Sequence, residues 1–189
     1  MPERKEVRLA GSGGQGLILA GVILAEAAGI HEGKFVAQTQ SYGPEARGGA
    51  SKSEVVISDA EIDYPKAMKP DMLLCLNQAA CDAYVFDLQP GGTILADRDL
   101  VTHLPTSRAV ALPFTRIARE ETGSDMFANI VALGALSALT GIVSLESLET
   151  ALRARVPPHT VDLNLKALKA GAAAARQFLT RKGNAQPRV

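Results

Sequence analysis

The chain has 189 residues, of which 47% are hydrophobic and only 4% aromatic. A domain of this length can bury roughly 70% of its unfolded surface, so it can fold around a core of Ala, Leu, Val and Ile without metals or disulfides. Twenty Lys and Arg balance twenty Asp and Glu with no long run of one sign, which disfavours nucleic acid or an anionic membrane surface as the partner.

The first two thirds of the chain predict strands separated by two helices. A strand over 6–10 runs into a glycine loop, and an apolar helix over 17–28 follows, with Gly29 at its C-cap. Later elements are expected as strands at 34–40, 54–58 and 71–76, a helix at 78–88, and strands at 93–96 and 109–112. This order predicts an α/β domain with a mixed, mostly parallel sheet and a Rossmann-like start of strand, glycine loop and helix.

The last third of the chain predicts only helices. They are expected at 115–121, at 126–139 ending at Gly141, at 145–156 behind an N-cap at Ser144, and at 161–180. We therefore expect a single domain over 1–182 and a polar tail over 183–189. No signal-peptide pattern opens the chain, and helix 17–28 is too short to span a bilayer, so we expect a cytoplasmic protein without a membrane partner.

The sequence offers no set of metal ligands and no catalytic acid–base pair. Its two cysteines, Cys75 and Cys81, lie six residues apart, which matches no Cys-x-x-Cys spacing, and its three histidines are scattered. We interpret the cysteines as reduced thiols in or near the core. An iron–sulfur cluster held by this chain alone would need about four thiolates.

The first candidate site is the glycine loop. Its glycines satisfy the pattern Gly-x-Gly-x-x-Gly between a predicted strand and a predicted helix. Glycines let the backbone approach a ligand, and the helix start at Leu17 presents free N–H groups and a positive dipole end to an anion. A tight turn whose glycines serve only packing is the alternative. The candidate binding residues are Gly11, Ser12, Gly13, Gly14, Gln15 and Gly16.

This loop predicts a phosphate but not the molecule that carries it. A dinucleotide fold places an acidic residue roughly 20 positions further on to bind the ribose hydroxyls. Residues 36–41 contain no carboxylate, which weakens an NAD interpretation. No Gly-Lys-Ser/Thr closes the motif, so a nucleoside-triphosphate loop is weaker still.

The second candidate site is the loop over 41–51, which places a phenol, a carboxylate and a guanidinium among glycines and a proline. Arg47 can offer a planar fork to a phosphate, and the backbone N–H groups after it can add to an anion site. A solvated turn with an ion pair between Glu45 and Arg47 is the alternative. If strand 34–40 runs parallel beside the first strand, both loops form one anion site. The candidate residues are Tyr42, Gly43, Glu45, Arg47, Gly48 and Gly49.

Together the two loops resemble the gamma subunits of 2-oxoacid:ferredoxin oxidoreductases. The likeness continues through 53–58, 62–65, 76–78 and 129–135, so it covers most of the chain and thins after about residue 145. The second loop, Tyr-Gly-Pro-Glu-Ala-Arg-Gly-Gly, is most similar to that of the 2-oxoglutarate members.

The resemblance implies one subunit of an enzyme complex. In this family a 2-oxoacid is oxidatively decarboxylated with coenzyme A to an acyl-CoA, and two electrons pass to ferredoxin. For 2-oxoglutarate the product is succinyl-CoA. The resemblance implies coenzyme A as a ligand shared by this chain, no cofactor bound by this chain alone, and thiamine diphosphate, Mg and iron–sulfur clusters in partner subunits.

The implied partners are the alpha and beta subunits and ferredoxin, with a ferredoxin-like delta subunit as a further candidate and a homodimer for the isolated chain. Two other functions remain open. One is a free-standing NAD(P)-dependent oxidoreductase, for which no catalytic set is evident in the sequence. The other is a purely structural subunit that contacts no ligand.

Overall fold

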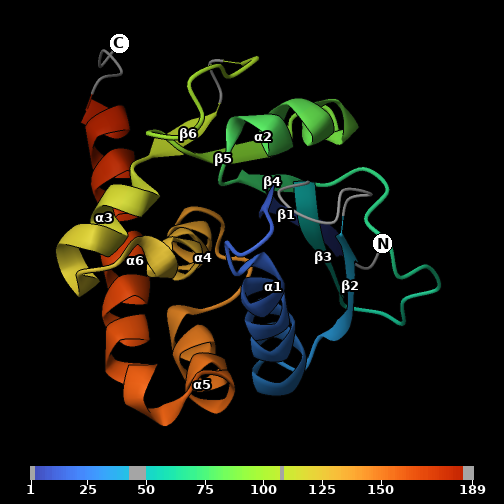
Figure 1. The fold of residues 1–189 in the computed structure, drawn as a ribbon. Coiled ribbons are helices and arrows are strands. Elements are labelled where there is room, and N and C mark those ends of the chain that lie inside the picture. The colour runs from blue at the N-terminus through green and yellow to red at the C-terminus, as the bar shows by residue number, and fades with distance from the viewer. Residues whose placement is uncertain (1–2, 43–49, 107–108, 185–189) are drawn as a thin grey trace.

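The computed structural model describes residues 3–42, 50–106 and 109–184, which form a six-stranded sheet with helices on both faces (Figure 1). The strands are β1 (Arg4–Ser12), β2 (Phe35–Tyr42), β3 (Ala50–Ser58), β4 (Met72–Cys75), β5 (Thr93–Asp97) and β6 (Val110–Leu112). Their order across the sheet is β2-β3-β1-β4-β5-β6. Strands β1, β4, β5 and β6 are parallel, whereas β3 is antiparallel to both of its neighbours. The predicted α/β fold with a mixed, mostly parallel sheet is confirmed.

Helix α2 covers one face of the sheet, and the other helices cover the opposite face (Figure 1). The helices are α1 (Leu17–Glu26), α2 (Gln78–Tyr84), α3 (Phe114–Thr122), α4 (Ala128–Thr140), α5 (Leu145–Arg155) and α6 (Val161–Asn184). Short turns of other helix types are η1 (Ala27–His31), η2 (Val85–Asp87), η3 (Asp125–Phe127) and η4 (Pro158–Thr160). The predicted helical last third is confirmed.

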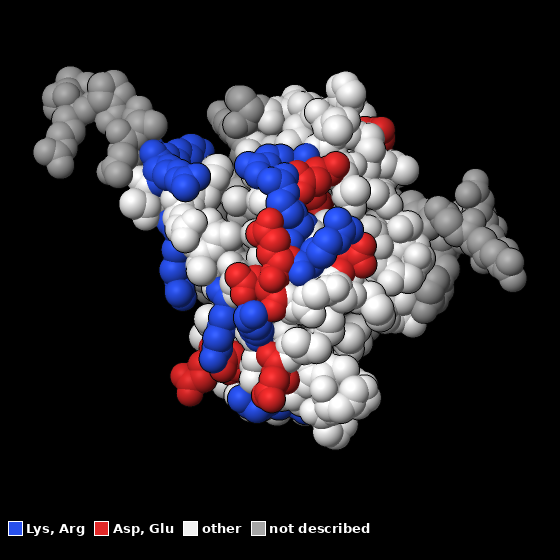
Figure 2. All heavy atoms as spheres, turned by 60° about the vertical axis from the view of Figure 1, so that its left-hand side comes forward, with Lys and Arg blue, Asp and Glu red and all other residues white. Residues whose placement is uncertain are grey.

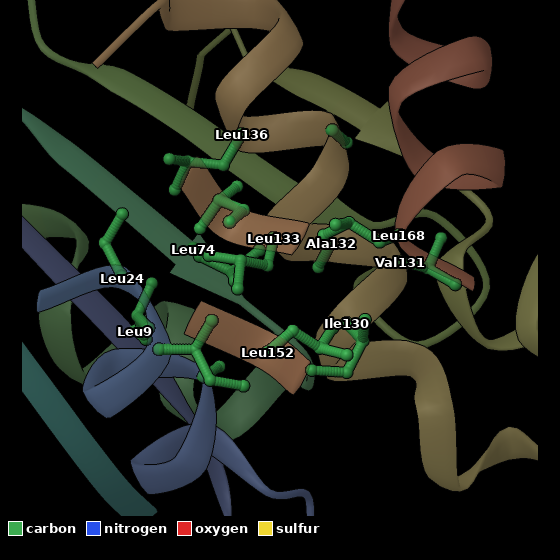
Figure 3. Close-up of a cluster of buried hydrophobic side chains, with 14 of the residues drawn as sticks. Leu9, Leu24, Leu74, Ile130, Val131, Ala132, Leu133, Leu136, Leu152 and Leu168 are labelled. Carbon is green, nitrogen blue, oxygen red and sulfur yellow. The ribbon is translucent and has the colours of Figure 1, made fainter. Parts of the chain in front are cut away.

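The main core is built around α4. This helix carries no charged residue, and its residues 128–137 are all buried, as expected for a helix covered on every side. Figure 3 shows Ile130 and Leu133 of α4 among apolar side chains from the sheet and from three other helices. These neighbours are Leu9 of β1, Leu74 of β4, Leu24 of α1, Leu152 of α5 and Leu168 of α6.

Helices α4 and α6 cross in backbone contact. A Cβ placed on Gly134 of α4 would lie 2.0 Å from the carbonyl oxygen of Leu168. A Cβ on Gly171 of α6 would lie 1.8 Å from the carbonyl oxygen of Val131. Only glycine fits at either position, so α4 is held in place by its backbone as well as by its side chains.

Several predicted boundaries differ from the structure. The C-cap expected at Gly29 is wrong, because α1 passes into the π turn η1 and Gly29 lies inside it, where a Cβ would be 2.7 Å from a Val36 methyl group. The left-handed residue after this helix is Gly33, with φ of 69°. At the other junction, Gly141 with φ of 64° ends α4 and the Ser144 hydroxyl caps α5, as predicted.

Other elements extend or divide relative to expectation. Strand β3 begins at Ala50 and not at 54, and the helix expected over 78–88 is divided into α2 and η2. Helix α6 continues to Asn184, so the first two residues of the expected tail are helical. The remainder of that tail, 185–189, lies outside the described residues.

Both cysteines are free and fully buried, as interpreted from the sequence. Cys75 ends β4 and Cys81 lies in α2, in the smaller apolar cluster between that helix and the sheet. The hydrogen bond with Cys81, together with burial, raises the pKa of the Cys75 thiol above its ordinary range. Both effects favour the protonated thiol of Cys75, as expected for a cysteine in an apolar core. Within 3–42, 50–106 and 109–184, no helix has the length and apolar character needed to cross a membrane.

Candidate functional site

The glycine loop lies at the point where the sheet divides its helices between two faces. Helix α1, which follows β1, packs on one face, and α2, which follows the adjacent parallel strand β4, packs on the other. In open α/β sheets, ligands bind in the crevice at the carboxyl ends of two such strands. Residues 13–16 follow β1 and Leu76 follows β4, and Gly14, Gln15 and Leu76 line a pocket at this edge.

Gln15 braces the glycine loop from within. Its side-chain oxygen accepts the backbone N–H of Ser12 at 2.7 Å, and its side-chain amide donates to the Leu76 carbonyl at 3.2 Å. A Cβ on Gly11 would lie only 2.4 Å from the same Gln15 oxygen, so the glycine makes room for the brace. The Gln15 side chain thus ties the loop to the end of β4.

Gly13 and Gly14 form the open part of the loop. Both are exposed, and a Cβ added to either would meet no heavy atom within 4 Å. Gly14 has a φ of 91°, which favours glycine, whereas Gly13 lies outside the left-handed region. A ligand can therefore approach the backbone at this point without displacing any described side chain.

Helix α1 starts directly after this opening without a cap of its own. No side chain caps it, and its first turn holds no acidic residue. Its first backbone hydrogen bond runs from the Ala20 N–H to the Gly16 carbonyl, so the N–H groups of residues 17–19 remain available at the positive end of the dipole. Phosphate suits such a helix start.

A pocket of about 250 Å³ adjoins the loop. It is lined by Gly14, Gln15, Leu76, Leu100, Thr115, Asp125, Met126 and Ala128. Leu100 and Met126 are 41% and 82% exposed, which gives the pocket an apolar rim. Its one described carboxylate, Asp125, is paired with Arg119 at 3.1 Å. No Lys or Arg is among the described residues that line it, so its attraction for an anion comes from backbone groups.

The second loop is attached beside the first. Ala50 of β3 lies opposite Ser12 of β1, and Tyr42 at the end of β2 lies opposite Ser51. The Ser51 hydroxyl also reaches the Gly11 carbonyl at 3.5 Å. The hypothesis of one anion site shared by both loops placed β2 directly beside β1. In the structure the antiparallel β3 lies between these two strands. Five predicted residues lie outside the described ranges, namely Gly43, Glu45, Arg47, Gly48 and Gly49.

Sequence reasoning missed one residue that acts on the glycine loop. The side-chain amide of Asn129, at the start of α4, donates to the Gly16 carbonyl at 2.9 Å. In the sequence, Asn129 is marked only by its place in the segment 129–135 that resembles the family. A polar residue among apolar ones at a helix start was the available signal, but it does not reveal a partner 113 positions away.

Several charged side chains elsewhere on the described surface form ion pairs with one another. Figure 2, which brings the side of α3 and α6 forward, shows Lys and Arg interspersed with Asp and Glu in one band. Ion pairs in this part of the chain join Arg116 to Asp99, Arg119 to Asp125, Lys166 to Glu121, and Lys169 to Glu149. Within the described ranges, no three His, Cys, Asp or Glu side chains gather as metal ligands would.

A larger pocket, of about 430 Å³, lies at the opposite edge of the sheet. Two lysines line it, but Lys34 pairs with Asp59 and Lys5 with Glu3. The hydrogen bond and the charge of Asp59 raise the pKa of Lys34, and Lys34 in turn lowers the pKa of Asp59. Since its cations are neutralised within the chain, this pocket is a poorer anion site than the glycine loop.

Comparison with known proteins places the chain in a family. The model described as "Pyruvate ferredoxin/flavodoxin oxidoreductase" matches residues 6–174. The chain belongs to this family. Among its relatives, 2-oxoglutarate synthase subunit KorC of Methanocaldococcus jannaschii is 55% identical over 93% of this chain and 96% of its own length. KorC of Methanothermobacter marburgensis is 48% identical over 89% of this chain and 95% of its own length.

Solved structures within the family share the fold. The keto/oxoacid ferredoxin oxidoreductase gamma subunit of Geobacter sulfurreducens has a TM-score of 0.82 at 52% identity, over 92% of this chain and 99% of that one. The 2-oxoglutarate:ferredoxin oxidoreductase of Magnetococcus marinus, solved with 2-oxoglutarate, coenzyme A and succinyl-CoA, has the same TM-score at 25% identity. It matches 93% of this chain but only 31% of its own. The family therefore uses this fold both as a separate subunit and as one part of a longer chain.

Proposed function

We propose that this chain is the gamma subunit of a 2-oxoglutarate:ferredoxin oxidoreductase and that its glycine loop binds part of coenzyme A. The complex would convert 2-oxoglutarate and coenzyme A to succinyl-CoA and pass the electrons to ferredoxin. The high identity to KorC subunits over nearly their whole length supports the assignment of 2-oxoglutarate as the substrate. The assignment of coenzyme A as the ligand depends on one observation. The backbone at Gly13 and Gly14 is open and lies just before the uncapped start of α1, and such a site suits the phosphates of coenzyme A.

The size of the pocket supports a site shared between subunits. At about 250 Å³ it is smaller than the range of roughly 300–1,000 Å³ typical of pockets that enclose a small ligand. Its apolar rim, Leu100 and Met126, is exposed in the isolated chain and offers surface for a neighbouring subunit to cover. We infer that the alpha and beta subunits complete the site and hold thiamine diphosphate, Mg and the iron–sulfur clusters, within a cytoplasmic complex.

The topology argues against the NAD(P) alternative. A dinucleotide fold needs a parallel strand next to β1, whose carboxyl end supplies the acidic residue for the ribose. In this chain the neighbour on that side is β3, which is antiparallel and brings its amino end to this edge. The residues that it places there are Ala50 and Ser51, which carry no carboxylate.

A bulky residue at Gly13 tests the coenzyme A proposal. Gly13→Leu adds a side chain in open space, at a backbone conformation that other residues accept, so it obstructs a ligand and not the fold. In the complex reconstituted with its partner subunits, we expect the KM for coenzyme A to rise by about tenfold or more. The KM for 2-oxoglutarate should change little. Thermal unfolding of the variant subunit should match that of the wild type.

The matched control is Ala154→Leu, which adds the same side chain at an exposed position of α5. Assembly of both variants with the partner subunits should be checked by size-exclusion chromatography. If Gly13→Leu assembles and leaves the KM for coenzyme A at the wild-type value, the glycine loop does not bind coenzyme A. That result would favour a purely structural subunit.

A further inference from the structure

A buried side chain of α4 holds the residue at which the glycine loop becomes helix α1. The amide nitrogen Nδ2 of Asn129 donates to the Gly16 carbonyl at 2.9 Å, and Asn129 is only 4% exposed. The same carbonyl accepts the first backbone hydrogen bond of α1, from Ala20 at 3.0 Å. One contact from a helix more than 100 positions away therefore fixes the start of α1.

The fit between these two residues is close. Gly16 has a φ of 70°, which favours glycine, and a Cβ on it would lie 2.4 Å from Asn129 Nδ2. Asn129 thus occupies the space that any side chain at position 16 would need. Its own helix cannot easily move, because α4 is buried on all sides and crosses α6 in backbone contact at Gly134.

This contact also orients the donors of the candidate site. In a planar trans peptide the carbonyl and the following N–H point in opposite directions. With the Gly16 carbonyl held by Asn129 and Ala20, the N–H of Leu17 is aimed out of the helix start, toward the side from which an anion would approach. Without that hold, a loop rich in glycine would populate many backbone conformations, and binding would have to order it.

We propose that Asn129 is the positioning residue of the glycine loop, fixing its backbone in the conformation that binds phosphate before the ligand arrives. The inference rests on the proposed function, in which that loop binds a phosphate of coenzyme A. Asn129 does not touch the ligand in this proposal. Its influence passes through the Gly16 carbonyl to the N–H groups of residues 17–19.

Two substitutions test the proposal. Asn129→Ala removes the donor, and the new alanine favours the helical conformation of α4. Asn129→Asp keeps the size of the side chain, but an ionised carboxylate cannot donate to the Gly16 carbonyl. In the reconstituted complex, each should raise the KM for coenzyme A by about tenfold, equivalent to about 1.4 kcal/mol. The kcat at saturating coenzyme A should stay within about twofold of the wild type, since saturation orders the loop.

Asn164 provides a matched control in α6. It is 5% exposed, and its Nδ2 donates to the Thr160 carbonyl at 2.9 Å, so its burial and bond resemble those of Asn129 at a place remote from the pocket. The Asn129 and Asn164 variants should all lower the Tm, because each loses a buried hydrogen bond. The Asn164 variants should leave the KM for coenzyme A unchanged. The contrast separates loss of stability from loss of loop positioning.

The Gly13→Leu variant distinguishes the two possible failures. If Gly13→Leu raises the KM for coenzyme A but the Asn129 variants match their Asn164 controls, Asn129 is only structural and the inference is wrong. If Gly13→Leu also leaves that KM unchanged, the proposed function itself fails. Should Asn129→Asp not fold, Asn129→Ala decides between these outcomes by the same measurement.

Discussion

Replacing Gly134 by Ala should destabilise the protein, because the added methyl group meets the backbone of α6. The Cβ would lie 2.0 Å from the Leu168 carbonyl oxygen and 3.2 Å from the Ala172 nitrogen. Backbone atoms inside a helix cannot rotate aside as the end of a side chain can. Helices α4 and α6 must therefore move apart, which loosens the core packed around α4.

Two effects of opposite sign set the size of the change. Overpacking at a backbone contact costs about 3 kcal/mol, at the upper end of the usual range. Alanine is the better helix former by about 1 kcal/mol, which offsets part of that cost. The free energy of unfolding should fall by about 2 kcal/mol, or about 4–8 °C in Tm for a domain of this size.

Urea and thermal unfolding followed by circular dichroism measure this loss. Ala173→Gly, at an exposed position of α6, is the control that reports the propensity effect alone. The double variant Gly134→Ala with Gly171→Ala should lose less than the sum of the single changes, since both push the same two helices apart. A Gly134→Ala variant as stable as the wild type, or more stable, would show that propensity dominates and that the backbones are not in contact.

Two further predictions concern activity, one in the assembled enzyme and one in the isolated chain. Arg47→Ala should raise the KM for coenzyme A by about tenfold or more and leave that for the 2-oxoacid nearly unchanged, because a charge-assisted fork to a phosphate would be lost. A change confined to the 2-oxoacid response would give Arg47 a different role. The isolated chain, supplied with 2-oxoglutarate, coenzyme A and thiamine diphosphate, should not reduce a viologen dye, and reduction would refute its dependence on partner subunits.

Local sequence signals were enough to predict most of the fold. The strand, glycine loop and helix at the start, and the junction from Gly141 to Ser144, each depend on residues within a few positions of one another. The β-branched and apolar runs likewise predicted all six strands. Errors arose where a local signal had two meanings. Gly29 follows an apolar helix as a C-cap does, but it is a glycine because η1 packs closely on Val36.

The candidate site was less predictable because its geometry depends on distant pairings. The sequence shows three consecutive strand candidates over 34–76, but not that the middle one, β3, inserts between β1 and β2. The brace from Gln15 to Leu76 and the bond from Asn129 to Gly16 likewise join residues far apart in the chain. A motif identifies the glycines, whereas the contacts that hold them appear only in three dimensions.

The position of β3 also has a consequence for synthesis of the chain. Strand β1 is made first but lies in the middle of the sheet, and its antiparallel partner is complete only at Ser58. At 5–20 residues per second, β1 waits roughly 2–9 s for that strand. Its parallel partner β4 emerges later still, ending at Cys75. The antiparallel unit β2-β3-β1 can therefore assemble during translation, before any parallel pairing is possible. The parallel strands can then pair in turn with the free edge of β1, beginning with β4.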